Sequence, residues 1–176
     1  MGAEIVGIQY SPVPENFDRN KKPRGGFPMI QLNSAELVAG KGIRSLEGVE
    51  DRYFGETGQE LNGAYPNNKV RQLSIITWDA VERANNKCEI PFTWAETRRN
   101  VVISNLSAED LNDLLGKRFS IDGVELEGVE LCDPCDRPDK LSGKKGFKLG
   151  FTNQNGQSIG GLRVKILNSG LISAEK

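Results

Sequence analysis

Short, β-branched segments bounded by turn-forming residues constrain the fold of this chain more than any other feature of its sequence. Such segments, each of five to eight residues with glycine, proline or polar residues at its ends, are typical of strands in all-β proteins. Four of them span residues 5–10, 70–76, 99–104 and 161–167. The sequence therefore predicts a mainly β fold.

The clearest hairpin is predicted between residues 118–121 and residues 124–131. The two segments are joined by Asp122-Gly123, a pair that favours the tight turn whose twist matches two flanking strands. The apolar alternation of the second segment shifts phase across Gly128, which indicates a β-bulge. The bulge would bend the strand just before Cys132.

Two short helices are predicted among these strands. Residues 77–87 begin at a capping threonine, and residues 107–115 begin with Ser107 followed by Asp110 at capping-box spacing. Many short strands with two small helices predict a closed or nearly closed β-barrel with insertions. With 176 residues, the chain is expected to form a single domain over residues 1–176.

Composition excludes several classes of function. The chain carries 23 basic and 24 acidic side chains, so we expect no nucleic-acid partner, which would require a strongly basic face. No stretch is apolar enough for a membrane span or a signal peptide, so a cytoplasmic protein is expected. Histidine is absent, which excludes every mechanism that uses an imidazole base or ligand.

A serine-hydrolase motif is present in form only. Residues 156–160 read Gly-Gln-Ser-Ile-Gly, the pattern of a nucleophile elbow. The serine of such a motif needs a histidine to accept its proton, and this chain has none. We therefore interpret the segment as turns at the ends of a hairpin.

The three cysteines do not form a disulfide framework, because their number is odd. Cys88 is in phase with Trp78 and Val81 on the first predicted helix, so it is expected to be a buried apolar residue. Cys132 and Cys135 flank a turn, and at least one of these two thiols should be accessible.

Several roles stay open for the pair Cys132 and Cys135. They are a redox-active dithiol, half of a zinc site shared across a dimer, a single reactive thiol, and a purely structural pair. The dithiol role is disfavoured because no helix is predicted after the pair. Residues 122–139 carry seven acids and one base, which disfavours a thiolate, although a lysine-rich loop follows and could reverse this balance.

Arg98 and Arg99 stand at the start of a predicted strand, and adjacent side chains on a strand face opposite sides. One arginine would therefore point inward and require an anionic partner. That partner would be Glu96, or else a phosphate or carboxylate group of a ligand.

Taken in order along the chain, these motifs resemble the MOSC domain, named for the C-terminal region of molybdenum cofactor sulfurase, in its stand-alone bacterial form. The resemblance covers about residues 4–173. The segments that carry it are residues 41–43, 51–54, 72–75, 96–103, 115–126, 131–135, 160–164 and 170–172.

The resemblance implies a barrel of the pyruvate-kinase type that binds the molybdenum cofactor (molybdopterin) and is independent of pyridoxal phosphate. A cysteine would serve as a sulfur carrier or as a metal ligand, in sulfur transfer or in the reduction of N-hydroxylated substrates. Carried onto this sequence, the catalytic residues are Cys135, also the metal ligand, and Cys132, and the cofactor-binding residues are Arg98, Arg52, Asn100, Asp51 and Glu96.

Whether the protein is an enzyme, a molybdenum-cofactor-dependent sulfurtransferase or reductase, is left open by the sequence. Its partners would be the cofactor and a sulfur donor or an electron-transfer protein, since the chain has no flavin, haem or iron–sulfur motif. The alternatives are a non-catalytic barrel that binds an anionic small molecule or a protein partner, with structural cysteines, and a thiol–disulfide exchange protein.

Overall fold

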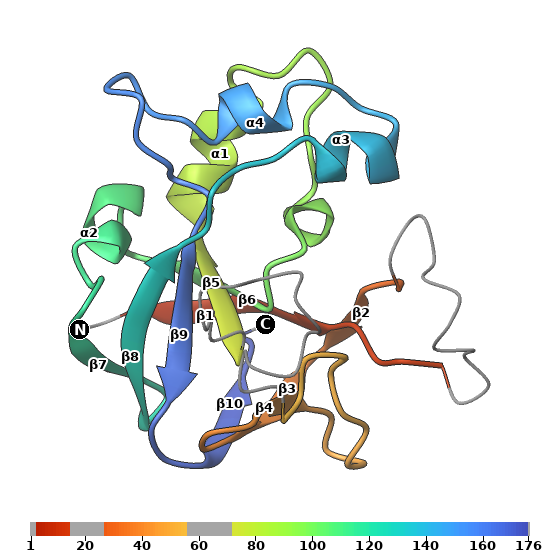
Figure 1. The fold of residues 1–176 in the computed structure, drawn as a ribbon, viewed down its shortest axis with the longest axis vertical. Coiled ribbons are helices and arrows are strands. Elements are labelled where there is room, and N and C mark those ends of the chain that lie inside the picture. The colour runs from red at the N-terminus through yellow and green to blue at the C-terminus, as the bar shows by residue number, and fades with distance from the viewer. Residues whose placement is uncertain (1–2, 15–26, 56–71, 176) are drawn as a thin grey trace, which may run out of the picture.

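The computed structural model describes residues 3–14, 27–55 and 72–175, which form ten strands and a few short helices (Figure 1). The strands are β1 (Glu4–Tyr10), β2 (Ile30–Leu32), β3 (Ser34–Val38), β4 (Gly42–Arg44), β5 (Leu73–Thr77), β6 (Val101–Ser104), β7 (Arg118–Ile121), β8 (Val124–Leu131), β9 (Leu162–Ile166) and β10 (Gly170–Ser173). The helices are α1 (Trp78–Asn85), the 3₁₀ helix η1 (Trp94–Thr97), α2 (Ala108–Asn112), α3 (Arg137–Ser142) and α4 (Phe147–Gly150).

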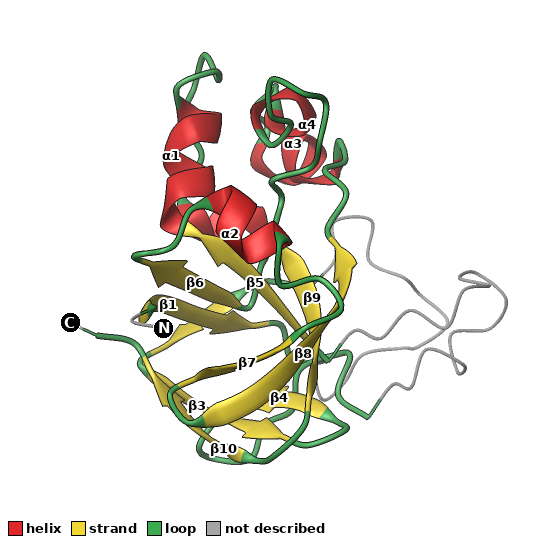
Figure 2. Cartoon of the chain, turned by 90° about the vertical axis from the view of Figure 1, so that its left-hand side faces the viewer, coloured by secondary structure: helices red, strands yellow, loops and turns green. Residues whose placement is uncertain are grey.

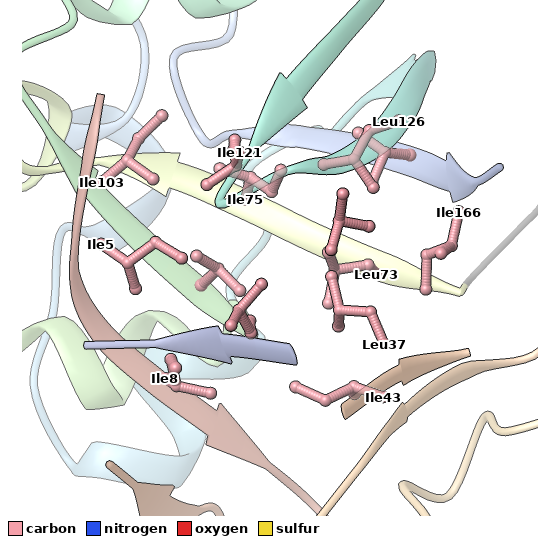
Figure 3. Close-up of a cluster of buried hydrophobic side chains, with 14 of the residues drawn as sticks. Ile5, Ile8, Leu37, Ile43, Leu73, Ile75, Ile103, Ile121, Leu126 and Ile166 are labelled. Atoms are coloured by element: carbon pink, nitrogen blue, oxygen red, sulfur yellow. The ribbon is translucent and has the colours of Figure 1, made fainter. Parts of the chain in front are cut away.

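The strands are divided between two sheets. Seven strands form one sheet in the order β2-β1-β6-β5-β9-β8-β7, in which only β5 and β6 run parallel to each other. The other three form an antiparallel sheet in the order β10-β3-β4. Isoleucines, leucines and valines from both sheets meet in one buried cluster, which Figure 3 shows in close-up.

The predicted mainly β fold is confirmed, but the expected closed or nearly closed barrel is wrong for the described strands. β2 and β7 are the two edges of an open seven-stranded sheet, and the three-stranded sheet is separate from it. Apolar packing, rather than a continuous hydrogen-bonded ladder, holds the sheets together. A few backbone bonds add to this packing, among them Glu175 N to Ile5 O at 2.8 Å, which ties the segment after β10 to β1.

The predicted hairpin and bulge are both confirmed. β7 and β8 pair around Asp122-Gly123, and the register of β8 against β9 shifts between Gly128 and Glu130. Gly128 has a packing reason as well, because a Cβ atom there would lie 2.3 Å from the carbonyl oxygen of Leu114. Only glycine therefore fits at this position of β8, where the strand passes the backbone of Leu114.

The other four predicted strands correspond to β1, β5, β6 and β9, each with slightly different ends. Residues 70–71 of the second segment lie outside the described residues. β6 begins only at Val101, so the two arginines before it belong to a turn that follows η1.

Both predicted helices are present, with the expected caps. Thr77 accepts a hydrogen bond from Ala80 N at the start of α1, and Ser107 forms a capping box with Asp110 at the start of α2. α3 and α4 were not predicted, and they gather with α1 and α2 at one end of the strands (Figure 2). Among the described residues, no helix combines the length and the apolar character needed to cross a membrane.

A second apolar cluster joins the helices to the outer face of the large sheet. α1 contributes Ala80, Val81 and Ala84, and α4 contributes Phe147, with Phe151 directly after it. Trp78, expected on the buried face of α1, is 40% exposed instead. The helical end of the molecule is thus a packed layer rather than a set of loose insertions.

Candidate functional site

A pocket of about 350 Å³ brings together residues from all parts of the described chain. Its most distinctive lining is a set of five arginines, two carboxylates and one thiol. These residues are Arg52, Arg98, Arg99, Arg137, Arg163, Asp51, Asp133 and Cys135. Positive charge therefore exceeds negative charge in the wall, and the pocket favours an anion.

Asp51 braces the loop that carries Arg52. Its buried carboxylate accepts hydrogen bonds from the backbone N–H of Ser11 at 2.7 Å and of Tyr53 at 3.0 Å. Burial raises the pKa of Asp51, and these two hydrogen bonds oppose the shift by stabilising the charged form. Asp51 therefore lines the pocket mainly as a structural support.

Arg52 presents an unsatisfied donor at this site. Its guanidinium stacks over the ring of Tyr53, with the central carbon 4.6 Å from the ring centroid. Its Nε atom is buried and has no hydrogen-bond partner among the described residues. A buried donor without a partner costs about 1–3 kcal/mol, so an anionic ligand that accepted from it would bind with that advantage.

Arg98 holds an unusual backbone conformation at the end of η1. Its φ of 59° is left-handed, and its Nη2 donates to the carbonyl oxygen of Phe27 at 2.8 Å. Burial lowers the pKa of Arg98 to about 10, and the charges of Arg52 and Arg137 act in the same direction. The lowered pKa thus reflects burial first, and the nearby like charges second.

Both members of the Arg98-Arg99 pair line the pocket, so the expectation that they face opposite sides is wrong. The reason is that the left-handed turn at Arg98 precedes the strand, and strand alternation does not apply. Arg99 donates from Nε to the carbonyl oxygen of Gly160 at 2.7 Å. Backbone carbonyls thus fix both side chains without neutralising them.

Asn100 lines the same pocket, but its side chain is engaged in holding strands together. Its Oδ1 accepts from the backbone N–H and the hydroxyl of Ser74, at 3.0 and 2.9 Å, and its Nδ2 donates to the carbonyl oxygen of Gln9 at 3.3 Å. Asn100 therefore ties β5, β1 and the start of β6 to one another at the floor of the site.

Glu96 does not line the arginine pocket. Its Oε2 accepts from Lys144 Nζ at 2.7 Å and from the backbone N–H of Thr93 at 2.7 Å, so the expected pairing with an arginine is wrong. Burial acts to raise the pKa of Glu96, but the hydrogen bonds from Lys144 and Thr93 outweigh it and the pKa is lowered. Glu96 instead lines a neighbouring hollow.

The two cysteines of the turn occupy different environments. Cys135 is exposed and lines the pocket, whereas Cys132 is 1% exposed and lies outside it. The backbone of Cys132 donates to Gly161 O and accepts from Ser158 Oγ, each at 2.7 Å. Cys132 thus anchors the turn, and Cys135 is the thiol that a ligand in the pocket would meet.

Cys88 lies beyond the end of α1 and is half-buried, with its Sγ 3.7 Å from Gly146 O. Burial, and then the charge of Asp139, raise the pKa of this thiol. The prediction that it packs as an apolar residue is confirmed in part, since it contacts the helical cluster. The described residues contain no group of three or more potential metal ligands.

A helix does follow the cysteine turn, contrary to the prediction. α3 begins at Arg137, two residues after Cys135. The basic loop beyond it is held elsewhere, because Lys140 pairs with Asp136 and Lys144 pairs with Glu96. Positive charge at the pocket therefore comes from arginines rather than from the lysine-rich loop.

Two of the five arginines in the pocket, Arg137 and Arg163, were not among the site residues predicted from the sequence. Arg163 forms an ion pair with Glu130 across β9 and β8. The signal of Arg163 was a charged residue between the apolar residues Leu162 and Val164 of a predicted strand, and the signal of Arg137 was its position just after the cysteine turn.

The rejection of the hydrolase motif agrees with the structure. Ser158 donates its hydroxyl to a backbone carbonyl, and Thr152 and Ser158 form an antiparallel bridge around a turn at Gly156. The segment is a hairpin-like turn, as predicted.

Comparison with known proteins identifies the family of this chain. The sequence model of the MOSC domain matches residues 60–176, and the chain belongs to that family. A search of curated protein sequences gives no significant match.

Solved structures share the fold. The YuaD protein of Bacillus subtilis is 20% identical, with a TM-score of 0.71, and the match covers 99% of this chain and 92% of that one. YiiM of Geobacillus stearothermophilus is 13% identical, with a TM-score of 0.60 and coverage of 98% and 71%. YiiM of Escherichia coli is 13% identical, with a TM-score of 0.56 and coverage of 97% and 66%.

The different burial of the three thiols predicts an order of alkylation. With iodoacetamide on the native protein, Cys135 should react first, Cys88 more slowly, and Cys132 only after unfolding, because a buried thiol is shielded from the reagent. Peptide mass spectrometry at timed intervals measures this order. Modification of Cys132 as fast as Cys135 would contradict the placement of the turn.

The left-handed backbone at Arg98 predicts an unusual ranking of two variants. Arg98→Gly should be about 1 kcal/mol more stable than Arg98→Ala, because both remove the guanidinium but only alanine is strained at a φ of 59°. Urea unfolding measures the difference. At the exposed helical position Glu82 the order should reverse, with Glu82→Ala the more stable. The same ranking at both positions would refute the left-handed turn.

Proposed function

We propose that this protein binds the molybdenum cofactor in the arginine-lined pocket, and that Cys135 is the sulfur atom that acts on it, as a sulfur carrier or a metal ligand. The observation that carries the proposal is the meeting, in one pocket, of an exposed thiol and a guanidinium whose buried Nε lacks a partner among the described residues. Membership of the MOSC family supports the same assignment.

The donor set of the pocket fits this cofactor, which presents a phosphate group and a metal bound through sulfur. Arg52 and Arg98 would hold the phosphate, since guanidinium groups form paired, charge-assisted hydrogen bonds with it. The thiol of Cys135 is a soft ligand of the kind that suits such a metal or an activated sulfur atom. When bound, the cofactor supplies a redox-active metal centre.

The remaining residues would hold this arrangement in place. Asp51 and Asn100 fix the loop and the strand ends that carry Arg52 and Arg98. Cys132 fixes the turn through two backbone hydrogen bonds, so its role is positional rather than catalytic. Sulfur or electrons would come from a separate donor protein.

The difference in exposure between Cys132 and Cys135 argues against the two main alternatives. A dithiol pair needs both thiols within reach of a partner disulfide, and only Cys135 is exposed. A barrel with purely structural cysteines would bury both thiols, whereas Cys135 faces the pocket. We therefore favour a single reactive sulfur at position 135.

Expression of the full chain in cells supplied with the cofactor tests this proposal. The purified protein should contain molybdenum by elemental analysis, or one added sulfur atom by intact mass. Cys135→Ser should abolish whichever signal is found, and Cys88→Ser should retain it, because Cys88 lies outside the pocket.

Wild-type protein that carries neither molybdenum nor added sulfur under these conditions would contradict the proposal. Signals that survive unchanged in Cys135→Ser would contradict the role of this thiol.

A further inference from the structure

A fully buried glutamine of β1 contacts the turn that carries Arg98 and Arg99. Gln9 lies in the central part of the seven-stranded sheet, where its backbone pairs with Gln31 of β2 on one side and its N–H donates to Asn100 O at 2.7 Å on the other. A buried amide side chain is unfavourable unless its polar atoms find hydrogen-bond partners. The partners of the Gln9 side chain therefore indicate its role.

Both hydrogen bonds from the Gln9 side chain end on backbone carbonyls that bracket Arg98. Its Nε2 donates to Ala95 O at 3.1 Å and to Arg99 O at 2.8 Å. Only the NH₂ end of an amide can face two carbonyl oxygens, so these bonds fix the orientation of the side chain. Its Oε1 is buried and has no hydrogen-bond partner among the described residues. The amide is thus placed for its donors rather than for its acceptor.

The turn that Gln9 contacts has a conformation that arginine rarely adopts. The φ of 59° at Arg98 is unfavourable for a residue with a Cβ atom, and such conformations persist only where the surrounding structure enforces them. Local bonds close the turn, since Arg98 N donates to Ala95 O at 3.1 Å and Arg99 N donates to Thr97 Oγ1 at 3.3 Å. The Gln9 side chain adds something different, because it attaches this turn to β1.

Gln9 does not line the arginine pocket, so it can affect a ligand there only through the turn. The side chain of Arg98 starts from this turn and lines the pocket. A change in the backbone angles of Arg98 would redirect its whole side chain. A guanidinium forms paired hydrogen bonds with a phosphate only when its position and its plane are both correct. The hydrogen bonds of Gln9 therefore bear directly on how Arg98 meets an anion.

We propose that Gln9 is a positioning residue for anion binding, whose side-chain amide holds the left-handed turn so that the guanidinium of Arg98 is directed at the ligand. The inference rests on the proposed function, because it takes the arginine-lined pocket to be the anion site. It adds to that site a residue that touches neither the ligand nor the pocket wall.

Gln9→Met tests this role on the full chain, with inorganic phosphate as the probe. Methionine is similar in size to glutamine and suits a buried position, but it cannot donate to the two carbonyl oxygens. The variant should bind phosphate about fivefold more weakly than the wild type, because two hydrogen bonds of modest net strength are lost. Titration followed by calorimetry measures both Kd values. Equal values would overturn the inference.

Two further variants separate positioning from a general loss of stability. Gln72→Met is the matched control, since Gln72 Oε1 accepts from Ile166 N at 2.8 Å but Gln72 does not line the pocket. It should lower the unfolding midpoint and leave the phosphate Kd unchanged. Gln9→Met combined with Arg98→Met should bind phosphate as weakly as Arg98→Met alone, because Gln9 acts through Arg98. Equal weakening in Gln72→Met, or the full further loss in the double variant, would contradict the proposed role.

A measurement on the wild type decides the question if Gln9→Met does not fold. In ¹H–¹⁵N spectra, the side-chain NH₂ signals of Gln9 should shift as phosphate is added, and those of Gln31, which is exposed on β2, should not. Phosphate binding that leaves the Gln9 signals unmoved would refute this inference alone. A wild type that does not bind phosphate would refute the anion pocket and, with it, the role of Gln9.

Discussion

The crowding of guanidinium groups around one small pocket is the constraint on which the rest of this structure depends. Five arginines line it against two carboxylates, and the side chains of Arg98 and Arg99 are held in place by backbone carbonyls, which carry no compensating charge. Burial, and then the charges of Arg52 and Arg137, lower the pKa of Arg98, so both burial and crowding disfavour its charged state. This gathering of like charges carries an electrostatic cost that a bound anion would offset.

The fold provides the rigidity that this crowding requires. The pocket lies where the parallel strands β5 and β6 meet, and Asn100 bonds across them, so small displacements of the arginines are resisted by strand pairing. On the opposite wall, the bulge in β8 directs the chain toward Cys132, whose buried backbone bonds set the position of Cys135. Sheet register and turn geometry therefore place the thiol and the guanidinium groups in the same cavity.

Local features of the sequence predicted local structure well. The Asp122-Gly123 hairpin and the capped starts of α1 and α2 were all visible in the residues themselves. Longer-range features were not. Apolar alternation cannot distinguish one closed barrel from two packed sheets. α3 and α4, of six and four residues, are too short for a periodic signal and lack the side-chain cap that indicated α2. The partner of Glu96 lies 48 residues away.

Thermal unfolding in the presence of inorganic phosphate tests the central claim most directly, because phosphate is the simplest anion that the pocket should hold. At 100 times its Kd, phosphate should stabilise the wild type by about 2.7 kcal/mol, and Arg52→Met should lose most of this gain. Arg118→Met, at an exposed position of β7, should keep it. A wild type that phosphate does not stabilise beyond chloride at equal ionic strength, or an Arg52→Met variant that is stabilised equally, would contradict the account.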